Sequence, residues 1–221
     1  MRTMLPSPSI IDIYVFSFVI AIGAVITPGP VSTAIVSQAP RLGWKTGPLM
    51  AAGHSVLEFA IVGLITFGLG NWLAQPSMQT AIALLGGLLL AFMGGSMLVG
   101  NLRGRIHLPG ASGGGTVMTP RQVVGVGMLA TITNPFWYAW WVTVAAGYLA
   151  QAKAFSVLAV SAFYLGHITA DLAWDTTLST VIGGGRRWIT DGIYRGLLYA
   201  CGIFLVYLAY VFLGQGLKTI L

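Results

Sequence analysis

The chain contains very few charged residues. Only 7% of its 221 residues are Asp, Glu, Lys or Arg, whereas 56% are hydrophobic and the mean hydropathy is +0.84. Soluble domains carry roughly 25% charged residues, so the composition argues against a soluble protein. About 20 apolar residues span a bilayer as a helix, and the sequence predicts six such helices, roughly over residues 11–37, 47–70, 80–100, 123–149, 154–181 and 196–216.

Cysteine is almost absent, and so are common catalytic motifs. The single cysteine, Cys201, excludes an internal disulfide and a CxxC redox pair. No HExxH metalloprotease motif occurs, and the glycine run 113–115 is not followed by the Lys-Ser/Thr of a phosphate loop. We therefore expect no enzymatic activity and no cofactor.

The net charge of +6 arises from basic residues in short loops between the apolar runs. This distribution is typical of the positive-inside rule rather than of nucleic-acid binding. Three basic residues, Arg2, Lys153 and Lys218, belong to one side; the eight on the other are Arg41, Lys45, Arg103, Arg105, Arg121, Arg186, Arg187 and Arg195. The side with eight is predicted to be cytoplasmic, which leaves both termini outside.

Prolines interrupt two of the apolar runs near their middles. Thr27-Pro28-Gly29-Pro30 lies in the first run, and Asn134-Pro135 lies in the fourth. Proline removes a backbone donor and disrupts a helix, and lipid tolerates a broken helix only where the freed groups are buried in protein or line a wet cavity. Paired breaks in two halves of a chain are typical of a transporter's binding site.

The two halves also share a second feature. Gly53-His54 is followed by Glu58, and Gly166-His167 is followed by Asp171, each carboxylate four residues after its histidine. The predicted fold is therefore an all-α integral membrane protein with six transmembrane helices. Residues 1–100 form a first three-helix repeat, 101–122 a cytoplasmic linker and 123–221 a second repeat. An odd number of spans per repeat makes the repeats inverted.

The candidate site combines both breaks with both pairs. Residues at i and i+4 share one helix face, and ionisable residues inside a membrane usually mark function. Helix N-termini at the breaks favour an anion, and the carboxylates suit an amine, so an amino acid is the predicted substrate, with a proton as the coupling ion. The predicted substrate-binding residues are Thr27, Pro28, Gly29, Pro30, His54, Glu58, Asn134, Pro135, His167, Asp171 and Asp175.

Two alternatives remain open at this point. His54, Glu58, His167 and Asp171 could instead bind a divalent transition metal, since imidazoles and carboxylates suit Zn, Mn, Fe or Ni. Trp137, Trp140 and Trp141 are expected to belong to an interfacial belt or to packing rather than to the transport path. The sequence leaves a monomer and a homo-oligomer equally open.

The proline breaks resemble those of the lysine exporter (LysE) superfamily of bacterial and archaeal efflux proteins. The resemblance is carried by Thr27-Pro28-Gly29-Pro30, the glycine-rich start of the second run, and Asn134-Pro135, and it covers nearly the whole chain. It implies secondary efflux of amino acids across the prokaryotic cytoplasmic membrane, driven by proton exchange. Many such exporters have a lysine after Asn-Pro, whereas Phe136 stands there in this chain.

Overall fold

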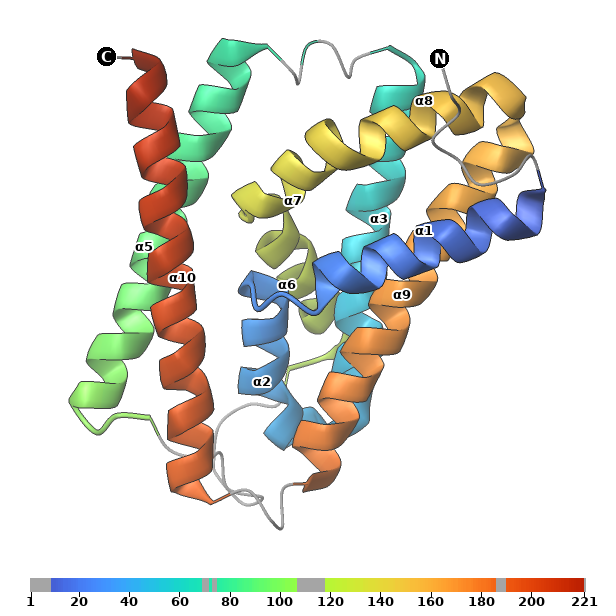
Figure 1. Ribbon diagram of the computed structural model, residues 1–221. Helices are drawn as coiled ribbons and strands as arrows, with labels where there is room; N and C mark the ends of the chain where they lie inside the picture. Colours follow the sequence, from blue (N-terminus) through green and yellow to red (C-terminus); the bar gives the residue numbers. More distant parts are fainter. Residues whose placement is uncertain (1–8, 69–71, 73–74, 107–117, 186–189, 221) are drawn as a thin grey trace.

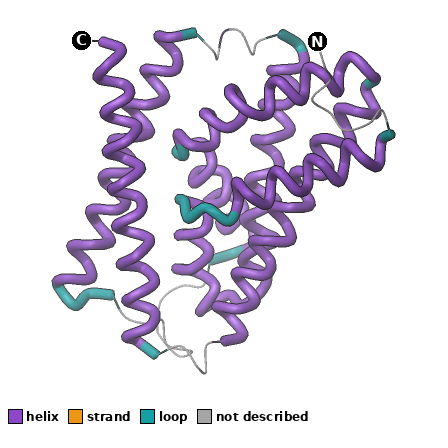
Figure 2. The backbone as a smooth tube through the Cα atoms, in the orientation of Figure 1, coloured by secondary structure: helices purple, strands orange, loops and turns teal. Residues whose placement is uncertain are grey.

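The computed structural model describes residues 9–68, 72, 75–106, 118–185 and 190–220, and this part of the chain consists of helices joined by short loops (Figures 1 and 2). Three of the basic residues used to predict the orientation, Arg2, Arg186 and Arg187, lie outside the described residues. So does most of the predicted linker (107–117). The helices are α1 (Ile10–Val25), α2 (Pro30–Leu42), η1 (Gly43–Lys45), α3 (Thr46–Thr66), α5 (Pro76–Leu102), α6 (Pro120–Ile132), α7 (Pro135–Trp140), η2 (Trp141–Ala145), α8 (Ala146–Phe155), α9 (Val157–Gly184) and α10 (Asp191–Ile220).

The first apolar run is broken where the prolines predict. α1 ends at Val25, and α2 begins at Pro30 with Gly29 as its N-cap. α2 continues to Leu42, five residues beyond the predicted end, because Pro40 lies inside the helix without ending it. Gly43, with φ of +70°, then allows the chain to reverse into α3.

The second broken run is more divided than predicted. α6 begins with a capping box between Thr119 and Gln122 and ends before Asn134, whose side-chain oxygen accepts a hydrogen bond from the Phe136 N–H. Asn134 therefore caps the start of α7. Beyond α7 the helix widens into the π-helical turn η2 and then continues as α8 to Phe155.

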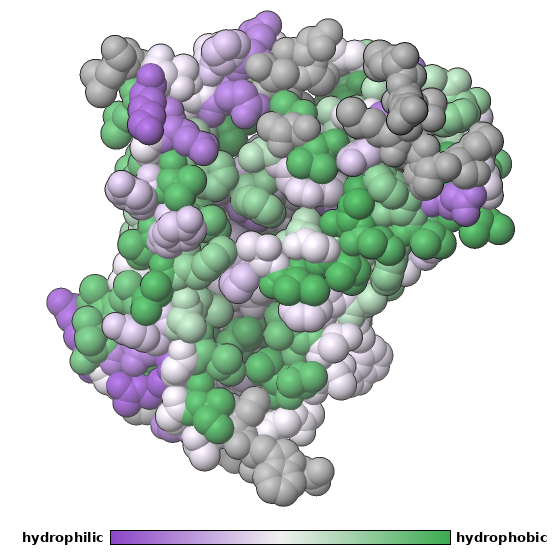
Figure 3. Space-filling model, in the orientation of Figure 1, coloured by the Kyte–Doolittle hydropathy of each residue, from purple (hydrophilic) through white to green (hydrophobic). Residues whose placement is uncertain are grey.

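Of the remaining helices, α5 and α10 are longer than predicted, α9 lies three residues later than predicted, and α3 ends at Thr66, four residues before its predicted end. α5 starts four residues earlier than predicted, α9 ends at Gly184, and α10 starts at Asp191. Among the described residues, four helical segments are long and apolar enough to span a membrane: Pro30–Thr66, which comprises α2, η1 and α3, and Pro76–Leu102, Val157–Gly184 and Asp191–Thr219. Ile10–Val25 is a shorter apolar helix. Large apolar side chains such as Leu85, Phe92 and Tyr210 are exposed, and hydrophobic side chains cover most of the middle of the face in Figure 3, as expected of a lipid-facing surface.

Glycines set how closely the helices approach. A Cβ on Gly53 of α3 would clash with the Val124 carbonyl oxygen of α6, and a Cβ on Gly166 of α9 would clash with the Tyr14 carbonyl oxygen of α1. α5 and α10 pack along each other at one side of the molecule (Figure 1), and Gly94 of α5 lies against the Gly202 carbonyl of α10. Small residues therefore allow these helices to pack closely.

Candidate functional site

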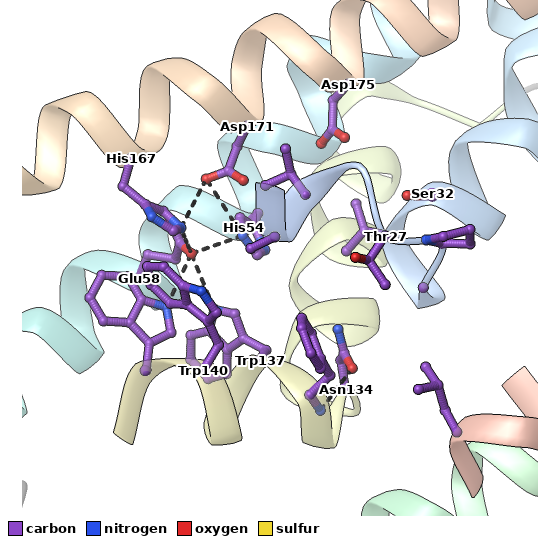
Figure 4. Close-up of a pocket in the computed structure, with 18 residues that line it drawn as sticks. Thr27, Ser32, His54, Glu58, Asn134, Trp137, Trp140, His167, Asp171 and Asp175 are labelled. Carbon is purple, nitrogen blue, oxygen red and sulfur yellow. Dashed lines mark hydrogen bonds and ion pairs between the residues drawn. The ribbon is translucent and has the colours of Figure 1, made fainter. Parts of the chain in front are cut away.

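A pocket opens where the two breaks meet in the middle of the molecule (Figure 4). It holds about 80 Å³ that the centres of water molecules can reach, whereas one water needs about 10–15 Å³, so there is room for several waters or a small polar molecule. Its lining comes from both breaks, both His/carboxylate pairs and the tryptophans of the second run: Thr27, Pro28, Gly29, Val31, Ser32, His54, Glu58, Asn134, Phe136, Trp137, Trp140, Trp141, His167, Asp171 and Asp175, with Ala24, Val25 and Leu208.

Glu58 is the centre of the polar contacts in this pocket. Its side chain is fully buried, and its Oε1 lies 2.9 Å from His54 Nε2 and 3.1 Å from His167 Nε2. The indole N–H groups of Trp137 and Trp141 each donate to the same oxygen at 3.2 Å. Four nitrogens therefore surround one carboxylate oxygen, although an oxygen of this kind has about two lone-pair sites.

The imidazoles of His54 and His167 lie between two carboxylates, those of Glu58 and Asp171. Asp171 Oδ2 lies 3.8 Å from His54 Nε2 and 3.6 Å from His167 Nε2. These distances are too long for hydrogen bonds but within reach after a small side-chain rotation. Each histidine thus bonds to Glu58 and lies close to Asp171.

The other ring nitrogen of His54, Nδ1, also has a hydrogen-bond partner. Thr131 donates its hydroxyl hydrogen to the Gly127 carbonyl at 2.8 Å, so its oxygen accepts from His54 Nδ1 at 2.7 Å. With a proton committed to Nδ1, the contact between His54 Nε2 and Glu58 requires one further proton, carried by one of the two groups. The arrangement can therefore hold a proton between His54 and Glu58.

Comparison with known proteins gives this pocket a context. The profile of the LysE type translocator family matches residues 22–216. The chain belongs to this family. It is also 24% identical over 194 residues to "Putative amino acid efflux protein YcgF" of Bacillus subtilis (strain 168), a match that covers 87% of this chain and 91% of that protein. No solved structure matches the chain significantly.

The structure of this LysE type translocator brings most of the predicted site residues into one pocket. All eleven except Pro30 and Pro135 line the pocket. Both of these prolines are buried, and Pro135 packs against the backbone of α5, where a Cβ on Gly86 would clash with its ring. These prolines begin α2 and α7, and the residues that precede them, Gly29 and Asn134, line the pocket.

The tryptophans agree with the sequence-based expectation only in part: Trp137 and Trp141 pack in a buried hydrophobic cluster, but all three tryptophans also line the pocket. Trp137 and Trp141 are buried, and both bind Glu58 rather than forming an interfacial belt. The half-buried Trp140 also lines the pocket, and its ring lies 4.5 Å from that of His167. Sequence analysis also missed Thr131 as the partner of His54. The positions of Trp137 and Trp141, one helical turn apart and directly after the Asn-Pro break, were the available signal.

Oxygen atoms without partners mark the open part of the site. Glu58 Oε2 and Asp171 Oδ2 are buried and have no hydrogen bond to any described residue. Asp175, one turn beyond Asp171 on α9, is 5% exposed and also lines the pocket. Buried polar groups normally have partners, so these carboxylates are suited to receive a polar ligand.

Three of the predicted metal ligands are close enough to share an ion. Atoms of His54, Glu58 and Asp171 lie within 4.8 Å of one another. Zn–ligand distances are about 2.0–2.2 Å, so this cluster would have to contract around a metal. The indole N–H groups of Trp137 and Trp141, which cannot coordinate a metal, already occupy Glu58 Oε1.

Proposed function

We propose that this LysE type translocator exports amino acids, or close derivatives, across the cytoplasmic membrane in exchange for protons. The observation that carries the proposal is the pocket that joins both helix breaks to buried carboxylates with unpaired oxygens. Its family and its amino acid efflux relative support an exporter rather than an enzyme.

The chemistry of the pocket suits a zwitterion. The start of α2 presents backbone N–H groups and the positive end of a helix dipole, which favour a carboxylate. Asp171 and Asp175 line the same pocket and favour an ammonium group. No lysine or arginine is among the lining residues, so the substrate carboxylate would be recognised by backbone groups.

The histidines support proton exchange. One proton is shared between His54 and Glu58, and both imidazoles lie between Glu58 and Asp171. A substrate ammonium at Asp171 would compete with a proton for that carboxylate. Export of the amino acid and entry of a proton would then use the same group at different times, which is the requirement for an exchanger.

We further propose that the chain crosses the membrane six times as two inverted three-helix repeats, with both termini outside. The first half-helix of each proposed repeat packs on the second helix of the other: α1 on α9, and α6 on α3. In both cases the glycine before the histidine, Gly166 or Gly53, makes the close approach. Inverted repeats with broken helices are typical of alternating access at a central site.

The metal hypothesis makes a different prediction for the same pocket. An exporter of Zn, Mn, Fe or Ni would bind the ion through His54, Glu58 and Asp171. The efflux relative is named for amino acids, and the aromatic groups bound to Glu58 favour a fixed carboxylate over a metal ligand. One binding experiment separates the two hypotheses.

That experiment is the thermal stability of the purified full chain with each amino acid and each metal. A ligand that binds only the folded protein adds about 2.7 kcal/mol at a hundredfold excess over Kd. We expect at least one amino acid to stabilise the wild type and the control Asp12→Asn, which changes an exposed carboxylate of α1, but not Asp171→Asn. Stabilisation by a metal alone would reject amino acid export.

A further inference from the structure

The two helix breaks have matching positions but different caps. Gly29 and Asn134 are each the N-cap of the helix that follows the break, and each is followed by proline at the first helical position. The Asn134 side chain accepts the Phe136 N–H at 3.1 Å and so closes the start of α7. Gly29 has no side chain, and α2 has no side-chain cap.

The start of α2 is therefore open toward the pocket. The first N–H groups of a helix have no partner within the helix, and proline at position 30 supplies none. The Thr33 N–H already bonds to the Gly29 carbonyl at 2.9 Å, which leaves the N–H groups of Val31 and Ser32. Both residues line the pocket.

The glycine is not required by backbone geometry. Its φ of −157° and ψ of −172° describe extended backbone that any residue adopts, and extended backbone is also what the following proline favours. A Cβ at position 29 would meet its nearest heavy atom, Asn134 Nδ2, at 3.7 Å, an ordinary contact. What a larger polar residue would change is the cap, since Asn, Asp and Ser close helix N-termini.

A second, independent observation marks the same pocket as a ligand site. Asp171 is 2% exposed, and its Oδ2 has no hydrogen-bond partner among the described residues. Figure 4 shows Asp171 and Asp175 on the α9 side of the pocket, with Thr27 and Ser32 from the first break to the right of them. The open N–H groups of α2 therefore share one cavity with Asp171, whose Oδ2 accepts no hydrogen bond from a described residue, and with the buried Asp175.

We propose that the open start of α2 binds the substrate's α-carboxylate and that Asp171, supported by Asp175, binds its ammonium group. Gly29 keeps the carboxylate site open, whereas Asn134 closes the equivalent site in the second half of the chain. We assign the ammonium to Asp171 rather than to Glu58, because His54, His167 and two indoles already surround Glu58 Oε1 and only Glu58 Oε2 is without a partner. This inference rests on the proposed function, and it assigns one orientation to the substrate.

The test transfers the cap of the second break to the first. Gly29→Asn gives α2 the cap that α7 has, and Gly29→Ala adds a side chain without a cap. Thermal shifts of the full-length protein are measured with the twenty amino acids and with the primary carboxamide of each. We expect wild type and Gly29→Ala to bind the same amino acids. Gly29→Asn should bind them at least about tenfold more weakly, although its melting temperature without ligand should be no lower. The carboxamides should bind weakly to all three proteins.

Several results would overturn the inference. Amino acid binding by Gly29→Asn equal to that of Gly29→Ala would mean that the start of α2 is not the carboxylate site. Equal binding of amino acids and carboxamides by the wild type would have the same meaning, and this comparison does not depend on how any variant folds. In both cases amino acid export would stand. Failure of the wild type to bind any amino acid would instead reject export and this orientation together.

Discussion

Glu58 shows how one buried residue can organise a site at the scale of single side chains. Its Oε1 collects two imidazole and two indole nitrogens from α3, α9, α7 and η2. Each of these groups would lack its partner if the carboxylate were removed. The carboxylate thus links both halves of the chain.

We therefore expect Glu58→Ala to unfold more easily than wild type by about 3–5 kcal/mol, because removing one partner of a buried ionic cluster leaves the others unpaired. Glu58→Gln retains one carbonyl acceptor and should lose about 1–3 kcal/mol. Chemical denaturation of the detergent-solubilised protein measures both. Equal stability of Glu58→Ala and wild type would show that the cluster does not hold the helices together.

The tryptophans allow a matched comparison. Trp137→Phe and Trp141→Phe each keep an aromatic ring but lose one N–H donor to a charged acceptor, which costs about 1.5–3 kcal/mol. Trp140 lines the same pocket without a hydrogen bond to Glu58 in the described structure, so Trp140→Phe should cost less than either. The same denaturation experiment ranks the three, and a larger loss for Trp140→Phe would contradict the assigned contacts.

Sequence analysis could predict much of the site but not its internal contacts. His54, Glu58, His167 and Asp171 were predictable because ionisable residues are rare and costly in apolar helices. The indole donors were not, because tryptophan occurs both at membrane interfaces and in pockets, and only the approach of η2 to α3 decides between them. Trp141 is also the first residue of a π-helical turn, which has no clear sequence signal.

At the scale of helices, glycines position α3 and α9 against the opposite half of the chain. Gly53 and Gly166 precede the two histidines, and a Cβ on either would clash with a backbone carbonyl oxygen. Backbone cannot yield as a flexible side chain can. The glycine before each histidine therefore determines how far its imidazole reaches into the pocket.

We expect Gly53→Ala and Gly166→Ala to lower stability by about 1–3 kcal/mol or more and to weaken amino acid binding. Gly63→Ala, also in α3, is the control, because no heavy atom lies within 4 Å of its added Cβ; it should be neutral or stabilising by up to about 1 kcal/mol. Melting temperatures with and without ligand measure both effects. Wild-type behaviour of Gly166→Ala would contradict the packing of α9 on α1.

Helix identities were predictable from apolar runs, whereas helix ends were less so. Pro28 and Pro135 mark breaks because proline cannot continue a helix. Pro40, by contrast, lies within α2, and Ser156 separates α8 from α9 with an extended backbone and caps the latter. The hydrophobic pattern does not change at either position, so sequence analysis misplaced these ends.

At the scale of the whole molecule, the proposed topology can be tested with single cysteines in a Cys201→Ser background. Lys218 and Arg103 are both exposed, near the end of α10 and just after α5 respectively. We expect a membrane-impermeant maleimide to label Lys218→Cys in intact cells and Arg103→Cys only after permeabilisation. The reverse pattern would invert the orientation, and labelling of both in intact cells would reject the proposed number of crossings.

The central claim is that one pocket exchanges an amino acid for a proton. Its most direct test is transport in liposomes that contain the purified protein, a labelled amino acid and an internal pH indicator. We predict that an imposed proton gradient drives amino acid movement in the opposite direction with matching proton flux, and that Asp171→Asn abolishes both while Asp12→Asn does not. Amino acid movement that is independent of the gradient and unchanged in Asp171→Asn would contradict the account.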